Sequence, residues 1–154
     1  MSEIKHFNIR VYALIINEKQ EILISDEFML NRRMTKFPGG GLKFGEGTID
    51  CLKREALEEF GQEIEIISHF YTTDFFQKAL FYEDHQLISI YYTARLLEPP
   101  RFKISNKPFD FPEDINGSIS FRLEQISDLH PGVLSFPIDR KVIEMLKEER
   151  IKKK

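Results

Sequence analysis

GGGLKFGEGTIDCLKREALEEFGQ, the stretch from Gly39 to Gln62, is the most informative part of this sequence. Its first three residues are glycines that follow Pro38 and predict a tight loop, because glycine admits backbone conformations and close approaches that other residues do not. The residues from Thr48 to Phe60 are mostly good helix formers, with Thr48 as the candidate N-cap and Gly61 where a helix commonly stops. The stretch therefore predicts a glycine loop that leads directly into a helix.

The predicted helix carries an acidic strip formed by Glu55, Glu58 and Glu59, which fall within roughly 100° of arc at 3.6 residues per turn. A different arc supplies an apolar stripe that should dock on a sheet, formed by Ile49, Leu52, Ala56 and Phe60. Acidic runs on helices are usually solvated surface charge. Crowded carboxylates repel one another, however, and the hard ion Mg2+ prefers oxygen ligands together with water and substrate phosphates. The strip beside a glycine loop therefore predicts a Mg2+ site, with Mn2+ as the alternative ion.

Seven positions of this stretch match one family signature in residue type and spacing, namely Gly40, Glu46, Arg54, Glu55, Glu58, Glu59 and Gly61. Together they resemble the Nudix box, which spans residues 40–62 here. The lead-in Phe37-Pro38-Gly39 is also similar to that family's usual sequence. Gln62 departs from the signature, which has a bulky apolar residue at this position. We expect looser packing at the helix exit, with Ile64 taking over the buried position.

The resemblance implies an α/β fold, a Nudix-type α/β/α sandwich with a mixed central β-sheet. It implies a MutT-like hydrolase that cleaves a phosphoric anhydride bond with water. The substrate would be a nucleoside diphosphate linked to another group, or a nucleoside triphosphate. Side motifs of the coenzyme A, NADH and ADP-ribose subclasses are not evident, so the substrate stays open.

The resemblance also implies roles for individual residues of the box. Glu55, Glu58 and Glu59 become metal ligands, and a backbone carbonyl of Gly39 or Gly40 becomes a further ligand. Two more residues would orient the loop and the helix from outside the ligand set, namely Glu46 and Arg54.

The general base is left open, because family members use either a box glutamate or an acid from a distant loop. Glu113 and Asp114 are the loop candidates here, and each could equally be a solvated charge. Candidate phosphate contacts flank the glycine loop, namely Arg32, Arg33, Lys36 and Lys43. Aromatic rings between residues 70 and 92 could stack on a base or sugar, although most of them must be core.

The remaining chain predicts one domain over residues 1–154, a common size for a single core. His6 to Ile16 and Glu21 to Ser25 predict a hairpin, and residues 28–36 predict an irregular connection or a short edge strand. Further strands are expected at residues 63–71, 86–97 and 118–123, a long loop at 98–116, and a closing helix at about 138–151.

The formal net charge of −3 argues against broad attachment to nucleic acid or to an anionic membrane. The sequence lacks a run of about 18 apolar residues and a signal-peptide organisation, so we expect a cytoplasmic protein. Cys51 is the lone cysteine and fits a small packing residue in a reducing compartment. Homodimers are frequent in the Nudix family, so a homodimer is a candidate assembly.

Two alternative functions use the same scaffold. A Nudix-fold binding or regulatory protein would sense a nucleotide without hydrolysing it, although such a sensor has no need for three metal ligands. An isomerase acting on a prenyl diphosphate should need a reactive cysteine near the substrate's carbon chain, and Cys51 lies inside the box helix instead.

Overall fold

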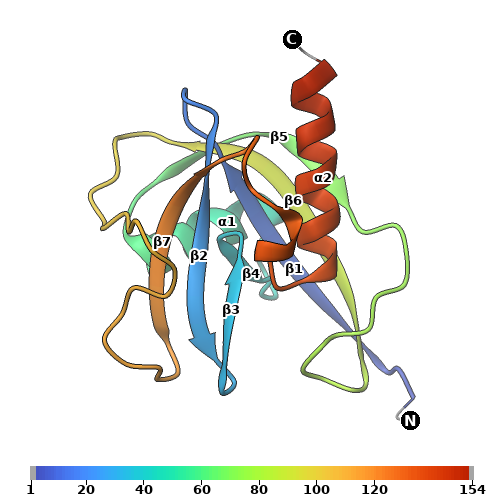
Figure 1. Cartoon of the computed structure of the whole chain (residues 1–154). Helices are drawn as coiled ribbons and strands as arrows, with labels where there is room; N and C mark the ends of the chain where they lie inside the picture. The colour runs from blue at the N-terminus through green and yellow to red at the C-terminus, as the bar shows by residue number, and fades with distance from the viewer. Residues whose placement is uncertain (1–2, 153–154) are drawn as a thin grey trace.

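The computed structural model describes residues 3–152 of the chain. Within them the chain forms seven β-strands, two α-helices and one 3-10 turn (Figure 1). In chain order these elements are β1 (His6–Ile15), β2 (Glu21–Met29), β3 (Arg32–Lys36), β4 (Gly39–Gly41), α1 (Thr48–Phe60), β5 (Ile64–Thr72), β6 (His85–Leu96), β7 (Ser118–Gln125), η1 (Pro131–Val133) and α2 (Pro137–Lys152).

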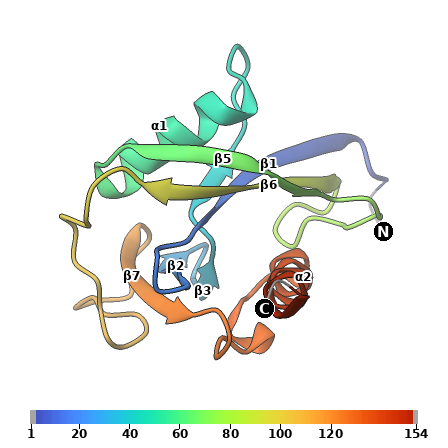
Figure 2. The same ribbon diagram turned by 90° about the horizontal axis from the view of Figure 1, so that it is seen from above.

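The strands form a four-stranded sheet in the order β4-β1-β6-β5 and a three-stranded sheet in the order β3-β2-β7. The four-stranded sheet is mixed, because β1 pairs parallel with β6 and antiparallel with β4. Figure 2 shows α1 on one side of this sheet and α2 on the other side, together with the three-stranded sheet. The predicted sandwich of helices around a mixed central sheet is therefore confirmed.

Strand β1 separates two hydrophobic cores, because successive side chains of a strand point to opposite faces. Tyr12 and Leu14 belong to the core on the α2 side. Val11 and Ala13 belong to the core on the α1 side. Burial on both faces explains why β1 reads as a nearly continuous apolar run.

The predicted hairpin between His6–Ile16 and Glu21–Ser25 is wrong. β1 and β2 lie in different sheets and meet at an isolated bridge between Ile16 and Ile22. Each strand is central in its own sheet and buried on both faces, so each finds its partners elsewhere in the chain. Nearness in sequence suggested a pairing that these two buried strands do not make.

Helix α1 begins one residue earlier than its predicted cap, Thr48, implied. Gly47 is the N-cap, and its backbone N–H donates to the Asp50 carboxylate at 3.1 Å. Gly61 ends the helix in the left-handed conformation, with φ of 69°. The buried stripe consists of Cys51, Leu52, Ala56 and Phe60, whereas Ile49 is exposed, which corrects the predicted stripe by one position.

Gln62 is buried and tethers the long loop at residues 98–116, so the expectation of looser packing there is wrong. Its side-chain Nε2 donates to the carbonyl of Pro99 at 3.2 Å, and its Oε1 accepts from the backbone N–H of Arg101 at 2.5 Å. Ile64 is buried as expected. A polar residue at this position satisfies loop backbone groups that an apolar residue would leave unpaired.

The other predicted elements lie close to the observed ones. The strands expected near residues 63–71, 86–97 and 118–123 correspond to β5, β6 and β7. Residues 28–36 contain β3, which is an edge strand, and a turn at Leu30 and Asn31 with positive φ. Neither helix within residues 3–152 has the length and apolar character that crossing a bilayer requires.

Replacing Gln62 by Leu should free the loop it holds. We expect Gln62→Leu to cost about 1–2 kcal/mol in the free energy of unfolding, because two hydrogen bonds are lost from a buried side chain. Amide hydrogen exchange at residues 98–103 should speed up, while exchange within α1 stays slow. Unchanged exchange at those residues, with unchanged stability in urea, would contradict the tethering role.

Candidate active site

Strand β4 consists of three glycines and forms one edge of the four-stranded sheet. It pairs with β1, with Gly40 opposite Val11 and Gly39 opposite Tyr12. A Cβ atom on Gly40 would lie 2.3 Å from Oε1 of Glu55, and one on Gly39 would lie 2.1 Å from the carbonyl oxygen of Val11. Glycine at these positions therefore lets the carboxylate of Glu55 lie directly against the edge strand.

A cavity of about 330 Å³ opens beside this edge. Tyr12 and Tyr91 line it from the sheet face that α2 covers, so the cavity lies on the face opposite α1. Apolar residues such as Leu80, Phe81 and Phe136 also line it. Its charged lining residues are Arg10, Glu27, Lys36, Glu55, Glu59 and Asp139. Acids from α1 therefore reach this cavity around the glycine edge.

Glu59 is a mostly buried acid, with 15% of its side chain exposed. Its Oε2 has no hydrogen-bond partner, and its Oε1 lies 3.9 Å from Nζ of Lys36. Burial raises the pKa of Glu59 to about 7, although Lys36 opposes the rise. The cavity thus holds a carboxylate oxygen that lacks a partner.

Lys36 lines the cavity, but its charge is already paired. Its Nζ lies 2.9 Å from Oε2 of Glu27, and its side chain is 6% exposed. Burial alone would lower the pKa of Lys36, but Glu59 and Glu27 outweigh burial and raise it to about 12. Lys36 therefore stays positive and balances two acids of the cavity.

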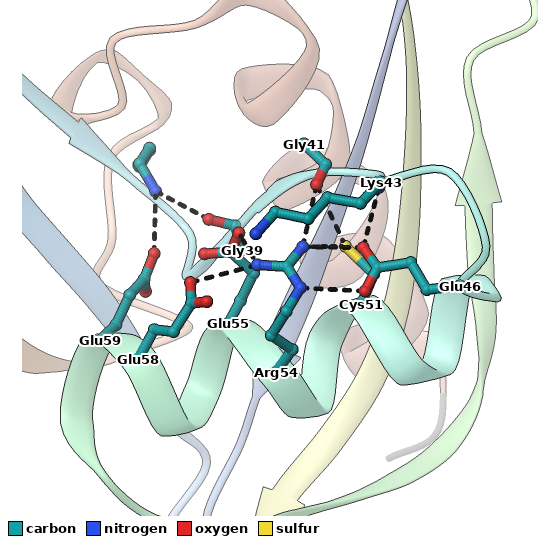
Figure 3. Close-up of polar contacts among 10 residues, drawn as sticks. Gly39, Gly41, Lys43, Glu46, Cys51, Arg54, Glu55, Glu58 and Glu59 are labelled. Carbon is teal, nitrogen blue, oxygen red and sulfur yellow. Dashed lines mark hydrogen bonds and ion pairs between the residues drawn. The ribbon is translucent and has the colours of Figure 1, made fainter.

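Arg54 connects the glycine loop to the acidic face of α1 (Figure 3). Its Nε and Nη2 donate to the two carboxylate oxygens of Glu46 at 2.9 and 2.7 Å. Its Nη1 donates to Glu55 at 3.0 Å, and Nη2 donates to the carbonyl of Gly41 at 3.1 Å. The hydrogen bond from Arg54 lowers the pKa of Glu46 to about 2. This bidentate pair fixes the loop against the helix.

Glu58 points away from the cavity lining in this conformation. Its side chain is 53% exposed, and its Oε2 accepts from Nη1 of Arg54 at 3.1 Å. The structure therefore brings Glu55 and Glu59 to the cavity and leaves Glu58 at its rim, held by Arg54.

The other expected substrate residues lie outside the cavity lining. Arg33 and Asp114 form an exposed ion pair with each other at 3.0 Å. Glu113 is exposed, and its backbone carbonyl accepts from the Ser118 hydroxyl at 2.9 Å. The guanidinium of Arg32 lies 5.3 Å from the ring centre of Phe81, which does line the cavity. The exposed Lys43 contributes its backbone N–H to Glu46, at 2.9 Å.

Cys51 is buried in α1, as expected for a packing residue. Its Sγ lies 3.6 Å from the carbonyl oxygen of Gly41. Burial raises the pKa of its thiol to about 12, so it carries no thiolate near neutral pH.

Sequence reasoning missed Arg10 and Asp139. Asp139 lies in the first turn of α2, where its carboxyl Oδ1 accepts from the Tyr91 hydroxyl at 2.5 Å and its buried Oδ2 has no partner. Burial raises the pKa of Asp139 to about 6. An acid near the start of a helix is common as a capping residue, so the sequence around Asp139 did not indicate a place in the site. Arg10 could have been found from the sequence, because it is a charged residue within a mostly apolar strand.

The residues of the cavity fit a hard divalent ion. Within residues 3–152, no three His, Cys, Asp or Glu side chains converge as a ready-made metal cage. Mg2+ does not need one, because it is typically held by one or two carboxylates, substrate phosphates and water. Glu55 and Glu59 supply two carboxylates, and Oε2 of Glu59 is an unpartnered oxygen for such an ion.

Comparison with known proteins identifies the sequence pattern. The NUDIX domain family model matches residues 6–135. An RNA pyrophosphohydrolase from Ruthia magnifica subsp. Calyptogena magnifica is 35% identical over 68 residues. That match covers 44% of this chain and only 37% of the relative's length, so the similarity is limited to part of each protein.

Solved structures resemble the fold over most of the chain. A NUDIX hydrolase from Nitrosomonas europaea superposes with a TM-score of 0.70 at 17% identity, covering 94% of this chain and 90% of that one. The MutT protein from Methanosarcina mazei Go1 gives a TM-score of 0.68 at 23% identity, covering 97% and 99% of the two chains. At these identities the likeness concerns the fold alone.

The raised pKa of Glu59 predicts a pH-dependent stability when divalent ions are removed with EDTA. Folding raises the pKa of Glu59 from its ordinary value of 4.5 to about 7, so the protonated side chain stabilises the folded protein at low pH. This stabilisation is lost as the pH rises from 4.5 through about 7. Between pH 5 and 8, wild type should lose on the order of 1–3 kcal/mol of unfolding free energy relative to Glu59→Gln. Urea unfolding at several pH values measures this difference.

The matched control is Glu58→Gln, the same change at an exposed position of the same helix. Its unfolding free energy should follow the pH dependence of wild type. Parallel curves for wild type and Glu59→Gln would mean that Glu59 is solvated in the metal-free protein.

Proposed function

The chain belongs to the NUDIX family, and from this we propose that it is a Mg2+-dependent hydrolase of phosphoric anhydride bonds. Its substrate is a nucleoside diphosphate linked to another group, or a nucleoside triphosphate. The observation that carries the proposal is the pair Glu55 and Glu59, which both line the cavity, with Oε2 of Glu59 unpartnered.

Charge explains why such a cavity needs a cation. A diphosphate and a carboxylate pair repel each other, and they can approach only with positive charge between them. Glu55 and Glu59 would hold Mg2+, and a carbonyl of Gly39 or Gly40 would add a ligand. When bound, the ion lowers the pKa of its water and neutralises charge on the leaving phosphate.

The chain's own residues prepare this end of the cavity. Glu46 and Arg54 hold the glycine loop and α1 in register, so that Glu55 stays against the edge strand. Glu58 lies three residues from Glu55 on the same face of α1, which makes it a third ligand candidate once it leaves Arg54. Orienting contacts of this kind maintain the geometry of metal ligands.

Glu59 is the proton acceptor that the geometry supports best. Its Oε2 is buried and unpartnered, and Glu59 lines the cavity in which the substrate would lie. Glu113 and Asp114 lie outside the cavity lining, and Asp114 is paired with Arg33. In this proposal Glu59 holds the ion through one carboxylate oxygen, and the attacking water gives its proton to the other.

The apolar part of the cavity lining suits a flat aromatic group. Small-molecule sites are mostly apolar, with a few polar groups that fix orientation, and a volume of about 330 Å³ is in the usual range. Leu80, Phe81 and Phe136 supply the apolar walls, and Asp139 adds a buried polar oxygen. A nucleobase fits this combination better than a second phosphate does.

A substrate panel tests the proposal directly. We expect purified protein with Mg2+ to release phosphate, pyrophosphate or a nucleoside monophosphate from at least one compound, and EDTA to stop the release. The panel contains nucleoside triphosphates, nucleoside diphosphate sugars, dinucleoside polyphosphates and a 5′-triphosphorylated oligoribonucleotide. Tight binding of a compound without product would indicate the non-catalytic sensor instead.

The carboxylate assignment predicts a strong effect of single substitutions. Glu59→Gln and Glu55→Gln should each lower kcat by about 100-fold or more, because each removes a charge from the reacting end of the cavity. Glu63→Gln, an exposed acid just beyond α1, is the control and should keep wild-type turnover. Near-normal Mg2+-dependent turnover in both cavity variants would show that the chemistry lies elsewhere.

A further inference from the structure

Arg10 lies in the row of β1 side chains that faces the cavity. Asn8, Arg10 and Tyr12 alternate along the strand, so they share one face, and all three line the cavity. The cross-strand neighbours of Arg10 are Gly41 on β4 and Ser89 on β6. Gly41 has no side chain and Ser89 has a small one, so neither neighbour covers the guanidinium of Arg10 on the cavity side.

The guanidinium of Arg10 has spare hydrogen-bonding capacity. Its Nε donates to the Tyr12 hydroxyl at 3.2 Å, and its central carbon lies 5.8 Å from the Tyr12 ring centre. A guanidinium has five N–H donors, so the four on Nη1 and Nη2 stay available. A Cβ added to Gly41 would contact Nη1 at 3.6 Å and, apart from its chain neighbours, no other heavy atom within 4 Å, so no other side chain fills the space above Gly41 beside this donor.

The two cations of the cavity differ in one respect. Lys36 forms a close ion pair with Glu27 at 2.9 Å. Arg10, in contrast, forms no ion pair with any carboxylate in the part of the chain the structure describes. Burial alone would lower the pKa of Arg10, but Tyr12 raises it, and Glu55 and Glu27 also raise it from beyond ion-pair distance, so the guanidinium stays positive. A partly desolvated cation without a close ionic partner gains from an anion that reaches it. Arg10 is therefore the cation of this cavity that an incoming anion can engage.

We propose that Arg10 is a substrate-binding residue whose guanidinium fork donates two hydrogen bonds to phosphate oxygens of the bound substrate. The proposal rests on the proposed function for the class of substrate. Arginine suits this role because its planar fork matches the spacing of phosphate oxygens, which a lysine ammonium cannot do. Its place beside Gly41, one residue beyond the glycine that Glu55 touches, puts it next to the acidic end.

Calorimetric titration with inorganic pyrophosphate in the presence of Mg2+ tests the contact without relying on turnover. We expect Arg10→Gln to weaken the Kd for pyrophosphate by at least about 10-fold, because two charge-assisted hydrogen bonds are lost. The matched control is Arg95→Gln on β6, whose exposed arginine pairs with Glu65 and does not line this cavity. Its Kd should stay within about two-fold of wild type.

Arg10→Lys keeps the charge and removes the fork, so it tests the geometry and serves where Arg10→Gln does not fold. Its Kd for pyrophosphate should weaken by roughly three- to ten-fold, with a thermal midpoint near that of wild type. KM for the best substrate of the panel should rise by a similar factor, while kcat changes less. Wild-type Kd in Arg10→Lys, or in a folded Arg10→Gln, would overturn the proposal.

The two proposals fail in distinguishable ways. Hydrolysis by wild type together with unchanged pyrophosphate affinity in the Arg10 variants overturns only the role of Arg10. Loss of pyrophosphate binding in Arg10→Gln, with no hydrolysis of any panel compound by wild type, supports the anion contact and overturns the hydrolase. Absence of pyrophosphate binding to folded wild type overturns the role of Arg10 whether or not hydrolysis occurs.

Discussion

The close approach of Glu55 to the glycine edge strand is the constraint on which the site depends. α1 packs on one face of the four-stranded sheet, whereas the cavity lies on the other face. A carboxylate can cross between them only around the edge, and at 2.3 Å a single Cβ on Gly40 would occupy its place. The pair of Arg54 with Glu46 then holds the loop so that this contact persists.

The cavity combines charges that only an outside partner completes. Lys36 offsets Glu27 and part of Glu59, yet Oε2 of Glu59 keeps no partner, and Arg10 keeps unused donors. An unpartnered carboxylate oxygen favours a bound cation, and a guanidinium with unused donors favours a bound anion. A metal ion together with a phosphate group meets both needs at once, and this complementarity is the physical basis of the proposed activity.

Local patterns predicted the helix of the box and its end at Gly61, because these follow from residue propensity. The resemblance to the Nudix box implied the mixed sheet between helices. The hairpin prediction failed because β1 and β2 each need burial on both faces and so join different sheets. Contacts between residues far apart in the sequence also explain why some predicted substrate-binding residues lie outside the cavity. Arg33 and Asp114, 81 positions apart, form an ion pair with each other. Arg10 and Asp139 meet in one cavity only through the fold, which no local spacing encodes.

The central claim is that Glu55 and Glu59 form a divalent-metal site beside the glycine edge. Anomalous diffraction from crystals soaked in Mn2+ tests it most directly, because Mn2+ accepts the same oxygen ligands as Mg2+ and can be located by its scattering. The account predicts an anomalous peak within bonding distance of both carboxylates. A fully occupied Mn2+ elsewhere on the protein, with Glu55 and Glu59 free of metal, would contradict it.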